Sequence, residues 1–238
     1  KNADTSLLAK NKSSALTIAI LNKHPASGVA LASEKLHPAS LHHATLLAIQ
    51  NKMEPLSLML LARDNLINAL DIDRRHALWH CANTGMIKPI EYLLKNKKLN
   101  LDTRDINGYS ALARAINNGF VQIAKLLIDQ GASIDTLTEE NNTLLMLSVV
   151  SGSTEITKKL LALNINVNSK NNSGDTALML AAATKKNELI EILIQADADI
   201  QTRNKDDLNA YEIALKAGHN ETATLIRERS SRLFKIFN

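Results

Sequence analysis

The sequence predicts an all-α fold, a solenoid of stacked helix pairs, and two observations lead to this prediction. A pattern of polar and apolar residues recurs along the chain at intervals of about 33 residues, which is typical of solenoid proteins. The 238 residues include only three Phe, three Tyr and one Trp, so Ala, Leu and Ile must build the core. Small aliphatic side chains of this kind suit helices that pack closely.

The clearest mark of the interval is a helix end. Gly131, Asn164 and Asp197 occupy matching places in "DQGASID", "ALNINVN" and "QADADIQ", each 33 residues after the one before. A chain that leaves an α-helix often passes through one left-handed residue. Glycine adopts this conformation without steric cost, and Asn and Asp tolerate it next best. The sequence therefore predicts a positive φ at all three positions.

The first helix of each unit is expected to begin at a polar residue and to continue with small apolar residues. The matching stretches are "HALWHCANTG" (76–85), "SALARAINNG" (110–119), "TLLMLSVVSG" (143–152), "TALMLAAATK" (176–185) and "NAYEIALKAG" (209–218). Ser, Thr and Asn are favoured at a helix start because their side chains accept hydrogen bonds from free backbone N–H groups. A second amphipathic stretch follows about one turn later, so each unit is predicted to be a helix pair.

Several landmarks agree in phase in "DINGYSALARAINNGFVQIAKLLIDQGASID" (105–135) and in "NNSGDTALMLAAATKKNELIEILIQADADI" (171–200). Both stretches resemble the ankyrin repeat, whose pattern is roughly D-x-x-G-x-T-P-L-H-x-A-A-x-x-G, then an amphipathic helix and G-A-D. The resemblance implies an ankyrin-type α-solenoid with short β-turn or hairpin loops between helix pairs. Five units follow from the spacing, at 71–104, 105–137, 138–170, 171–203 and 204–236.

The units depart from the family pattern at its Thr-Pro-Leu-His tetrapeptide. The proline is replaced at Ala77, Ala111, Leu144, Ala177 and Ala210, and the histidine at Trp79, Ala113, Met146, Met179 and Glu212. Without the hydrogen bonds of that histidine, we expect units less rigid than the family pattern implies. Thermal unfolding should then be broad and begin at low temperature, since each unit contacts only its neighbours. A single sharp transition at high temperature would contradict this expectation.

Residues 1–70 are predicted to hold about two degenerate repeats. "SALTIAILNK" (14–23) and "HATLLAIQNK" (43–52) share an A-I-x-N-K ending that resembles "ARAINNG" of the second clear unit. The chain starts with Lys rather than Met, and Asn2–Asn11 resembles the end of an earlier unit, so the array is expected to extend upstream. At the other end, Leu233, Phe234, Ile236 and Phe237 are predicted to fold back as a C-terminal cap or to pack on a following domain.

No set of residues in the sequence predicts an active site, a metal site or a cofactor site. The single cysteine, Cys81, excludes an internal disulfide and a multi-cysteine zinc site, and it is expected to be a small buried residue in a reducing compartment. His76 and His80 lie four residues apart, but no further ligand accompanies them. His80 is therefore expected to be partly exposed. The sequence has no glycine-rich phosphate loop, nucleophile elbow or HExxH motif, so we predict that the protein is not an enzyme.

The resemblance implies that the turn tips and the first helices form a concave surface that binds another protein. The candidate partner-binding residues are Arg75, Trp79, His80, Asn83, Arg104, Tyr109, Arg114, Asn117, Asn142 and Asp175. Tyr109 is either an interface anchor or packs on the neighbouring tip, and Trp79 is more readily explained as filling space between units. His80 and Arg114 stand where other units carry Leu or Ile, and they predict a polar patch beside Trp79.

The net charge of +4 is mild, but Arg75, Arg104, Lys170, Arg203 and Lys205 recur near the turn tips. This basic stripe is either ordinary solvated charge or a surface that attracts an acidic protein partner. The few aromatic residues and the interruptions at Leu137 and Glu139 argue against nucleic acid. No apolar run is long enough to span a membrane.

Taken alone, the sequence predicts a monomeric, non-catalytic scaffold in the cytoplasm that binds a protein through its concave face. The high content of Asn, Lys and Ile and the degenerate repeats resemble ankyrin proteins that intracellular bacteria deliver into host cells. That resemblance implies a host protein as partner. The alternative is a substrate-recruiting ankyrin arm of a larger enzyme whose catalytic domain lies outside this sequence.

Overall fold

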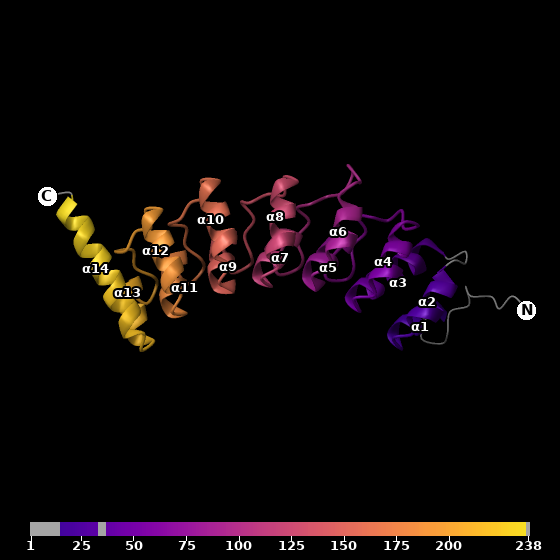
Figure 1. The fold of residues 1–238 in the computed structure, drawn as a ribbon, viewed down its shortest axis with the longest axis horizontal. Coiled ribbons are helices and arrows are strands. Elements are labelled where there is room, and N and C mark those ends of the chain that lie inside the picture. The colour runs from indigo at the N-terminus through magenta and orange to yellow at the C-terminus, as the bar shows by residue number, and fades with distance from the viewer. Residues whose placement is uncertain (1–14, 33–36, 237–238) are drawn as a thin grey trace, which may run out of the picture.

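The computed structural model describes residues 15–32 and 37–236, with side chains described as far as residue 230. Within these ranges the backbone forms helices and no sheet, so the predicted all-α solenoid is confirmed (Figure 1). The β-type pairing recorded for the described residues consists of two isolated antiparallel bridges, Arg104 with Ser110 and Leu137 with Thr143. Both bridges close a turn tip between successive helix pairs.

The described residues form fourteen helices arranged as seven consecutive pairs. They are α1 (Ala15–Leu21), α2 (Pro25–Ala32), α3 (Pro38–Gln50), α4 (Glu54–Leu61), α5 (Ala77–Thr84), α6 (Ile87–Leu93), α7 (Ala111–Asn117), α8 (Val121–Asp129), α9 (Leu144–Ser151), α10 (Thr154–Ala162), α11 (Ala177–Ala183), α12 (Asn187–Gln195), α13 (Ala210–Lys216) and α14 (Asn220–Ile236). The main helix–helix contacts join the two helices of a pair or equivalent helices of adjacent pairs. The chain is therefore a one-dimensional stack.

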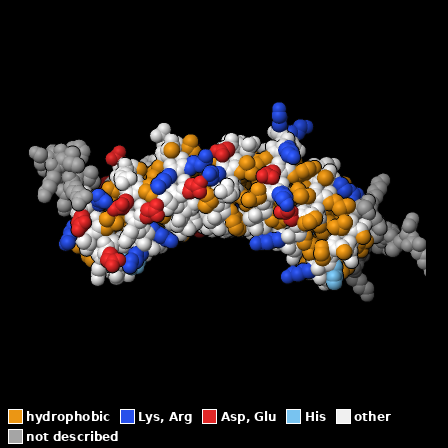
Figure 2. Space-filling view, in the orientation of Figure 1, with side chains coloured by type: hydrophobic (Ala, Val, Ile, Leu, Met, Phe, Trp, Pro, Cys, Tyr) orange, Lys and Arg blue, Asp and Glu red, His pale blue; other side chains and the backbone are white. Residues whose placement is uncertain are grey.

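The stack is curved, and the two helices of each pair lie on different sides of the curve. The odd-numbered helices, here called inner helices, line the lower edge in Figure 1, and the even-numbered outer helices lie along the upper edge. The space-filling view shows that the lower edge is hollowed, so the inner helices line a concave face (Figure 2). Apolar side chains gather on the surface toward the N-terminal end of the arch in the same view.

Each inner helix from α5 onward begins with a side-chain cap on the third backbone N–H of the helix. The caps are His76, Ser110, Thr143, Thr176 and Asn209, each accepting from the backbone N–H three residues later. A cap of this kind stabilises a helix by roughly 1 kcal/mol. The predicted helix starts are therefore confirmed, with a histidine ring in place of a hydroxyl at α5.

The shared helix-end conformation is confirmed, because φ is +85° at Gly131, +59° at Asn164 and +62° at Asp197. Two further positions of the unit are also left-handed. The turn tips contain Arg74, Gly108, Asn141, Gly174 and Asp207, and the inner helices end at Lys52, Gly85, Gly119, Gly152, Lys185 and Gly218. The backbone thus makes the same three sharp reversals in units 105–137, 138–170 and 171–203, whatever side chain is present.

Replacing Gly131 with alanine is expected to lower the free energy of unfolding by about 1 kcal/mol, since an L-residue is strained at this φ. No atom lies within 4 Å of the added Cβ, so the cost comes from the backbone alone. The midpoint of thermal unfolding, followed by circular dichroism, should fall by about 2–4 °C. The reverse change, Asn164→Gly, serves as the control and should raise the midpoint slightly. An unchanged midpoint for Gly131→Ala would contradict the explanation that a left-handed conformation selects Gly, Asn and Asp at this recurring position.

The buried apolar side chains of the described residues form two clusters. The larger one runs from Leu46 in α3 to Ile226 in α14, and the smaller one joins α1, α2, α3 and α4 through residues such as Ile20 and Leu60. Burial of apolar area favours folding more than any other contribution, at about 25 cal/mol per Å². Because α3 contributes to both clusters, the first two helix pairs are stacked on the rest of the array.

The unit boundaries and the division at residue 70 stay predictions, because helix bounds do not locate the first residue of a unit. The backbone of α14 includes Leu233, Phe234 and Ile236 of the predicted C-terminal cap. Their side chains, and Phe237, lie outside the described residues. Asn2–Asn11, which resembles the end of an earlier unit, also lies outside them.

Candidate functional site

The turn tips are built around one polar side chain each. In the second clear unit, Asp105 Oδ1 accepts hydrogen bonds from the backbone N–H groups of Asn107 at 3.0 Å and Tyr109 at 2.8 Å. Asp71, Thr138, Asn171 and Asn204 bind the equivalent loops. A side chain that replaces backbone hydrogen bonds within a turn fixes the turn's shape.

Adjacent tips are also joined to each other by backbone hydrogen bonds. The N–H groups of Ile106, Glu139, Asn172 and Lys205 donate to the carbonyl oxygens of Asp73, Asn107, Glu140 and Ser173, at 3.1, 3.1, 2.8 and 3.0 Å. We call this row of bonds the tip ladder. The tip ladder holds five tips, residues 71–75 to 204–208, at a constant spacing along one edge of the concave face.

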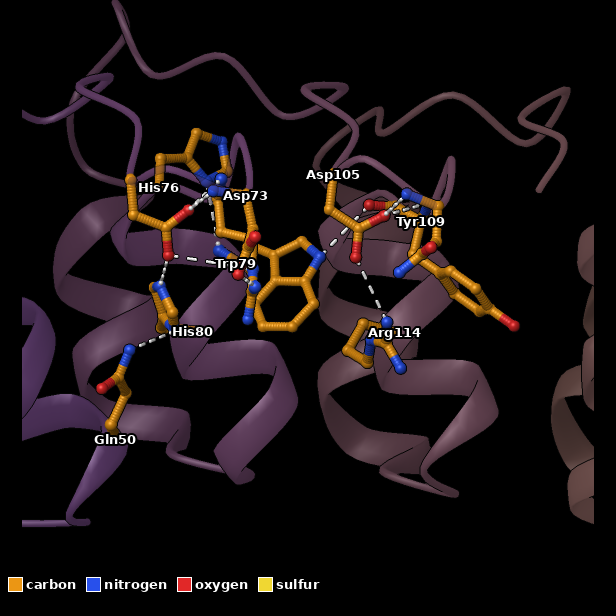
Figure 3. A network of polar contacts seen from close by, with 11 residues as sticks. Gln50, Asp73, His76, Trp79, His80, Asp105, Tyr109 and Arg114 are labelled. Atoms are coloured by element: carbon orange, nitrogen blue, oxygen red, sulfur yellow. Dashed lines mark hydrogen bonds and ion pairs between the residues drawn. The ribbon is translucent and has the colours of Figure 1, made fainter. Parts of the chain in front are cut away.

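Two of the five side chains that bind these loops, Asp71 and Asp105, are aspartates, and each uses its second oxygen to bind the inner helix that follows. Asp71 Oδ2 accepts from His80 Nε2 at 2.9 Å, and Asp105 Oδ2 accepts from Arg114 Nη2 at 3.2 Å (Figure 3). The Asp105 side chain is 3 % exposed, so an ionised carboxylate there needs a cationic partner. In the other units the tip residue is neutral, and the matching helix residues are Leu147, Leu180 and Ile213.

This pairing corrects the interpretation of His80 and Arg114. The sequence predicts a partly exposed His80 within a polar surface patch, but the residue is 1 % exposed and its ring binds Asp71. Arg114 is 19 % exposed and lies over two aromatic rings. Both side chains donate hydrogen bonds to tip carboxylates, and His80 is buried, so a contact of His80 with a partner would have to be indirect.

Trp79 packs between the first two clear units. The guanidinium carbons of Arg75 and Arg114 lie 5.0 and 4.8 Å from the centroid of its ring, and its Nε1 donates to the carbonyl oxygen of Tyr109 at 3.2 Å. The residue is only 4 % exposed. Trp79 therefore fills space between units, in agreement with the favoured interpretation, and is not an exposed groove anchor.

Tyr109 extends this cluster outward. The Arg114 guanidinium lies 4.2 Å from the centroid of the tyrosine ring, and Figure 3 shows the phenol pointing away from Trp79. Partial burial raises the pKa of Tyr109, Arg114 opposes that effect, and the carboxylates of Glu140 and Asp105 add to it. The phenol is therefore a neutral hydrogen-bond donor on a partly exposed ring, a combination that suits an interface anchor.

His76, which caps α5, and His80 within α5 are both buried, and both ring nitrogens of each contact polar groups. His76 Nε2 donates to the carbonyl oxygen of Asn100 at 2.9 Å while its Nδ1 caps the helix. His80 Nδ1 lies 3.3 Å from Gln50 Nε2, which joins α5 to α3. Burial lowers the pKa of both imidazoles, and the bond to Asp71 opposes that effect at His80.

Stability is expected to fall on mild acidification. The ordinary pKa of histidine is about 6.5, and a lowered folded-state pKa means that the unfolded chain binds protons more readily. The contribution is therefore fully present above about pH 6.5 and is lost as the pH falls below that value. Urea unfolding midpoints at pH 7.5 and pH 5.5 would measure the loss.

A double variant provides the control for this pH dependence. Asp71→Asn with His80→Leu reproduces the neutral pairing of Asn171 with Leu180 found later in the array. The variant should lose less stability between pH 7.5 and pH 5.5 than the natural chain does. An equal loss in both proteins would show that His80 is not responsible.

The remaining candidate residues are spread along the face. Asn83 and Asn117 are partly buried on α5 and α7, where Asn118 Nδ2 donates to Asn83 Oδ1 at 3.2 Å. Asn142 accepts from Asn171 Nδ2 at 2.9 Å, and Asp175 accepts from Asn204 Nδ2 at 2.7 Å. The fold thus gathers Arg75, Trp79, His80, Tyr109 and Arg114 into one cluster and leaves Asn142 and Asp175 in separate tips.

The predicted basic stripe is largely compensated within the chain. Arg75 forms ion pairs with Asp71 and Asp73, and Arg203 forms one with Glu212 at 2.9 Å. Lys170 Nζ donates to the carbonyl oxygen of Arg203 at 2.8 Å. Among the described residues, Arg104 and Lys205 are the members of the stripe for which no ion pair or side-chain hydrogen bond is seen.

The exposed, unpaired charges of the tips differ along the array. Arg74 and Arg104 lie near the first two tips, Glu139, Glu140 and Asp206 lie on the later ones, and Lys205 lies beside Asp206 on the last tip. None of these six side chains forms an ion pair with another described residue, so the later tips carry mostly, but not only, negative unpaired charge. Charge counting along the sequence missed this difference because it cannot tell paired residues from unpaired ones.

A hollow of about 270 Å³ lies on the concave face between α11 and α13. It is lined by Asp175, Met179, Leu180, Ala183, Asn204, Asp206, Leu208, Ile213, Lys216 and Ala217. Of these residues, Asp175 is one of the ten candidate partner-binding residues given above. No sequence pattern marks the hollow, because it exists where side chains are short.

Within the described part of the chain, no three His, Cys, Asp or Glu side chains come close enough to hold a metal ion. Cys81 is fully buried in α5, and burial raises the pKa of its thiol. Among the helices described, none combines the length and the hydrophobicity needed to cross a lipid bilayer.

Comparison with known proteins identifies one family and many similar chains in solved structures. The model of three consecutive ankyrin repeats matches residues 41–138, 78–171 and 145–233. A chain in the structure of a predatory endopeptidase from Bdellovibrio bacteriovorus in complex with an immunity protein is 28 % identical, with a TM-score of 0.72. The similarity covers 77 % of this chain and 96 % of that one. No curated protein matches the sequence.

Proposed function

Because the chain belongs to the ankyrin-repeat family, we propose that it is a binding scaffold that holds a protein partner against its concave face and turn tips. Ankyrin repeats are typically binding modules without catalytic activity, and the similar solved structure comes from a complex between two proteins. Binding then depends on complementary shape and charge, with no chemical turnover.

The observation that carries this proposal is the fixed presentation of Tyr109. Asp105 binds the backbone N–H and carbonyl oxygen of Tyr109, Trp79 also donates to that carbonyl oxygen, and Arg114 stacks on the tyrosine ring. A partner therefore meets an aromatic ring that is already ordered, so little side-chain entropy is lost on binding. Aromatic residues held in this way are often the few that dominate binding energy.

Tyr109→Ala is the variant that tests the proposal. A partner captured by the natural array should bind this variant at least about 30-fold more weakly, as expected for the loss of a dominant interface residue. Tyr92→Ala is the matched control, because Tyr92 is 37 % exposed on the outer helix α6. Equal affinities of the two variants, measured by titration calorimetry, would refute the assignment of the binding face.

We further propose that the N-terminal part of the tip edge binds an acidic, partly apolar surface. Arg74 and Arg104 are exposed there, and Ile72 and Ile106 beside them are 95 % and 49 % exposed. Charge reversal of Arg74 and Arg104 should slow association at low salt, because unpaired surface charges mainly affect the rate of encounter. An unchanged association rate would exclude an acidic partner at this edge.

We also propose an origin and a cellular location for this protein. The Asn-, Lys- and Ile-rich composition supports a bacterial protein delivered into the host cytoplasm, where it binds a host protein as a monomer. Translocation of a tagged copy into host cells during infection would test the delivery, and sedimentation would test the monomer. The alternative, a recruiting arm of a larger enzyme, would be supported by a catalytic domain encoded next to this sequence.

A further inference from the structure

We propose that the hollow between α11 and α13 binds one aliphatic side chain of the partner, with a lysine or arginine of the same segment beside Asp175 and Asp206. We call it the aliphatic pocket. The proposal rests on the proposed function, since it specifies what the C-terminal half of the same concave face recognises. It differs from the N-terminal edge, where the exposed charge is positive.

The floor of the aliphatic pocket is apolar. Met179 lies buried at its base, and Leu180 and Ile213 contribute partly buried side chains from neighbouring inner helices. Ala183 and Ala217 lie exposed at the helix ends. An aliphatic group placed here removes apolar surface from water on both sides, which is the main driving force of most protein association.

The apolar floor follows from the pairing of tips with inner helices. Asp71 and Asp105 are matched by His80 and Arg114, whereas the neutral Asn171 and Asn204 are matched by Leu180 and Ile213. Because no buried carboxylate needs compensation in the last two units, aliphatic side chains reach the concave surface there. The first two clear units carry the polar residues His80 and Arg114 at the same position.

The short side chain of Ala183 leaves the space open, because the preceding unit has Val150 and the unit before that has Asn117 at this position. The position of Asp175 is occupied by Asn142, which is of equal size, and one unit earlier by Tyr109. Pockets for small molecules are usually about 300–1,000 Å³, so the volume of about 270 Å³ suits a single side chain better than a complete ligand. The occupant is therefore part of a larger partner.

The rim provides the charge selectivity. Asp206 is exposed and forms no ion pair with a described residue, and Asp175 is bound only by the amide of Asn204. Both carboxylates come from the turn tips, whereas Lys216 lies on the helix side of the pocket. A cationic residue of the partner is attracted to the tip side and repelled from the helix side, so the segment has one preferred direction.

The probe for this site is an N-acetylated, C-amidated pentapeptide with leucine between two lysines and a glycine at each end. Protein labelled with ¹³C at Met, Leu and Ile methyl groups reports binding through Met179, Leu180 and Ile213. The peptide should shift these three methyl signals saturably. Replacing both lysines with glutamate should weaken binding about tenfold, and replacing leucine with serine should weaken it by at least as much.

Two variants test the location without loss of the fold. Asp175→Asn with Ala183→Val copies the residues of the preceding unit and should weaken peptide binding at least about tenfold. Asp206→Asn changes an exposed side chain and should weaken it about threefold. The control, Glu188→Gln with Ala162→Val, places the same types of change at exposed outer-helix positions and should bind the peptide as the natural chain does.

Shifts confined to other methyl groups, or no shift at millimolar peptide, would overturn the aliphatic pocket. Equal peptide affinity of the Asp175→Asn, Ala183→Val variant and of the Glu188→Gln, Ala162→Val control would also overturn it. The proposed function fails separately, if the natural array binds no protein or if Tyr109→Ala leaves partner affinity intact. A third outcome would overturn the aliphatic pocket but not the proposed function. In it, Tyr109→Ala weakens partner binding, whereas Asp175→Asn with Ala183→Val does not.

Discussion

Trp79→Ala should lower the free energy of unfolding by about 3–5 kcal/mol, the largest loss expected from one substitution in this chain. The ring is 4 % exposed and lies against the side chains of Arg75 and Arg114. Truncation leaves a cavity between two units and removes the donor to the Tyr109 carbonyl oxygen. Urea unfolding followed by far-ultraviolet circular dichroism measures the loss, since the variant has no tryptophan fluorescence.

Trp79→Phe separates the two effects. Phenylalanine retains most of the buried ring but lacks the indole N–H, so it should cost clearly less than alanine, with about 1 kcal/mol attributable to the lost hydrogen bond. Tyr109 should also become more mobile in both variants. A loss below about 1 kcal/mol for Trp79→Ala would show that the ring is not a structural contact between units.

The second large effect is expected from the ion pair between Asp105 and Arg114. Arg114→Leu leaves Asp105 Oδ2 buried without a partner and should cost about 3 kcal/mol. Asp105→Asn keeps the turn but leaves the guanidinium uncompensated, at a cost of about 1–3 kcal/mol. The double variant reproduces Asn171 with Leu180 and should be within about 1 kcal/mol of the natural chain, the remainder being lost cation–π contacts.

The double-mutant cycle formed by these variants measures the coupling energy between Asp105 and Arg114 directly. Together, the two single losses should exceed the loss of the double variant by at least about 3 kcal/mol, the upper end of the range found for residues in contact. The same cycle on Lys125 and Glu155, an exposed pair between outer helices, should give no measurable coupling. Additive losses at Asp105 and Arg114 would mean that the pairing of tip and helix residues is coincidental.

The sequence was sufficient for the fold because the repeat determines backbone conformation at a few recurring positions. Gly131, Asn164 and Asp197 could be predicted to share a left-handed φ because only a few residue types tolerate it. The family match from residue 41 also includes α3 and α4, which precede the five clear units. Each unit contacts only its neighbours, so the local sequence pattern of the units determines most of the overall fold.

The candidate site was predictable only in part, because side-chain pairing depends on which residues are buried together. Trp79, Tyr109 and Arg114 were named from the sequence, and the fold brings them into contact. The burial of His80 was missed, although the match of aspartate tips with His80 and Arg114, nine residues later, is visible in the sequence. No sequence motif indicated the aliphatic pocket, because the volume of a pocket depends on how the surrounding side chains pack.

The tip ladder has a consequence for how this chain can change in evolution. Excision of residues 138–170 would bring the N–H of Asn172 to the carbonyl oxygen of Asn107, which the N–H of Glu139 now occupies. The surviving units would close up with every remaining tip still joined to a neighbour. Glu139 and Glu140 would leave with the deleted segment. Gain or loss of whole units during evolution can thus change the surface charge that partners encounter, while the buried residues of the remaining units stay the same.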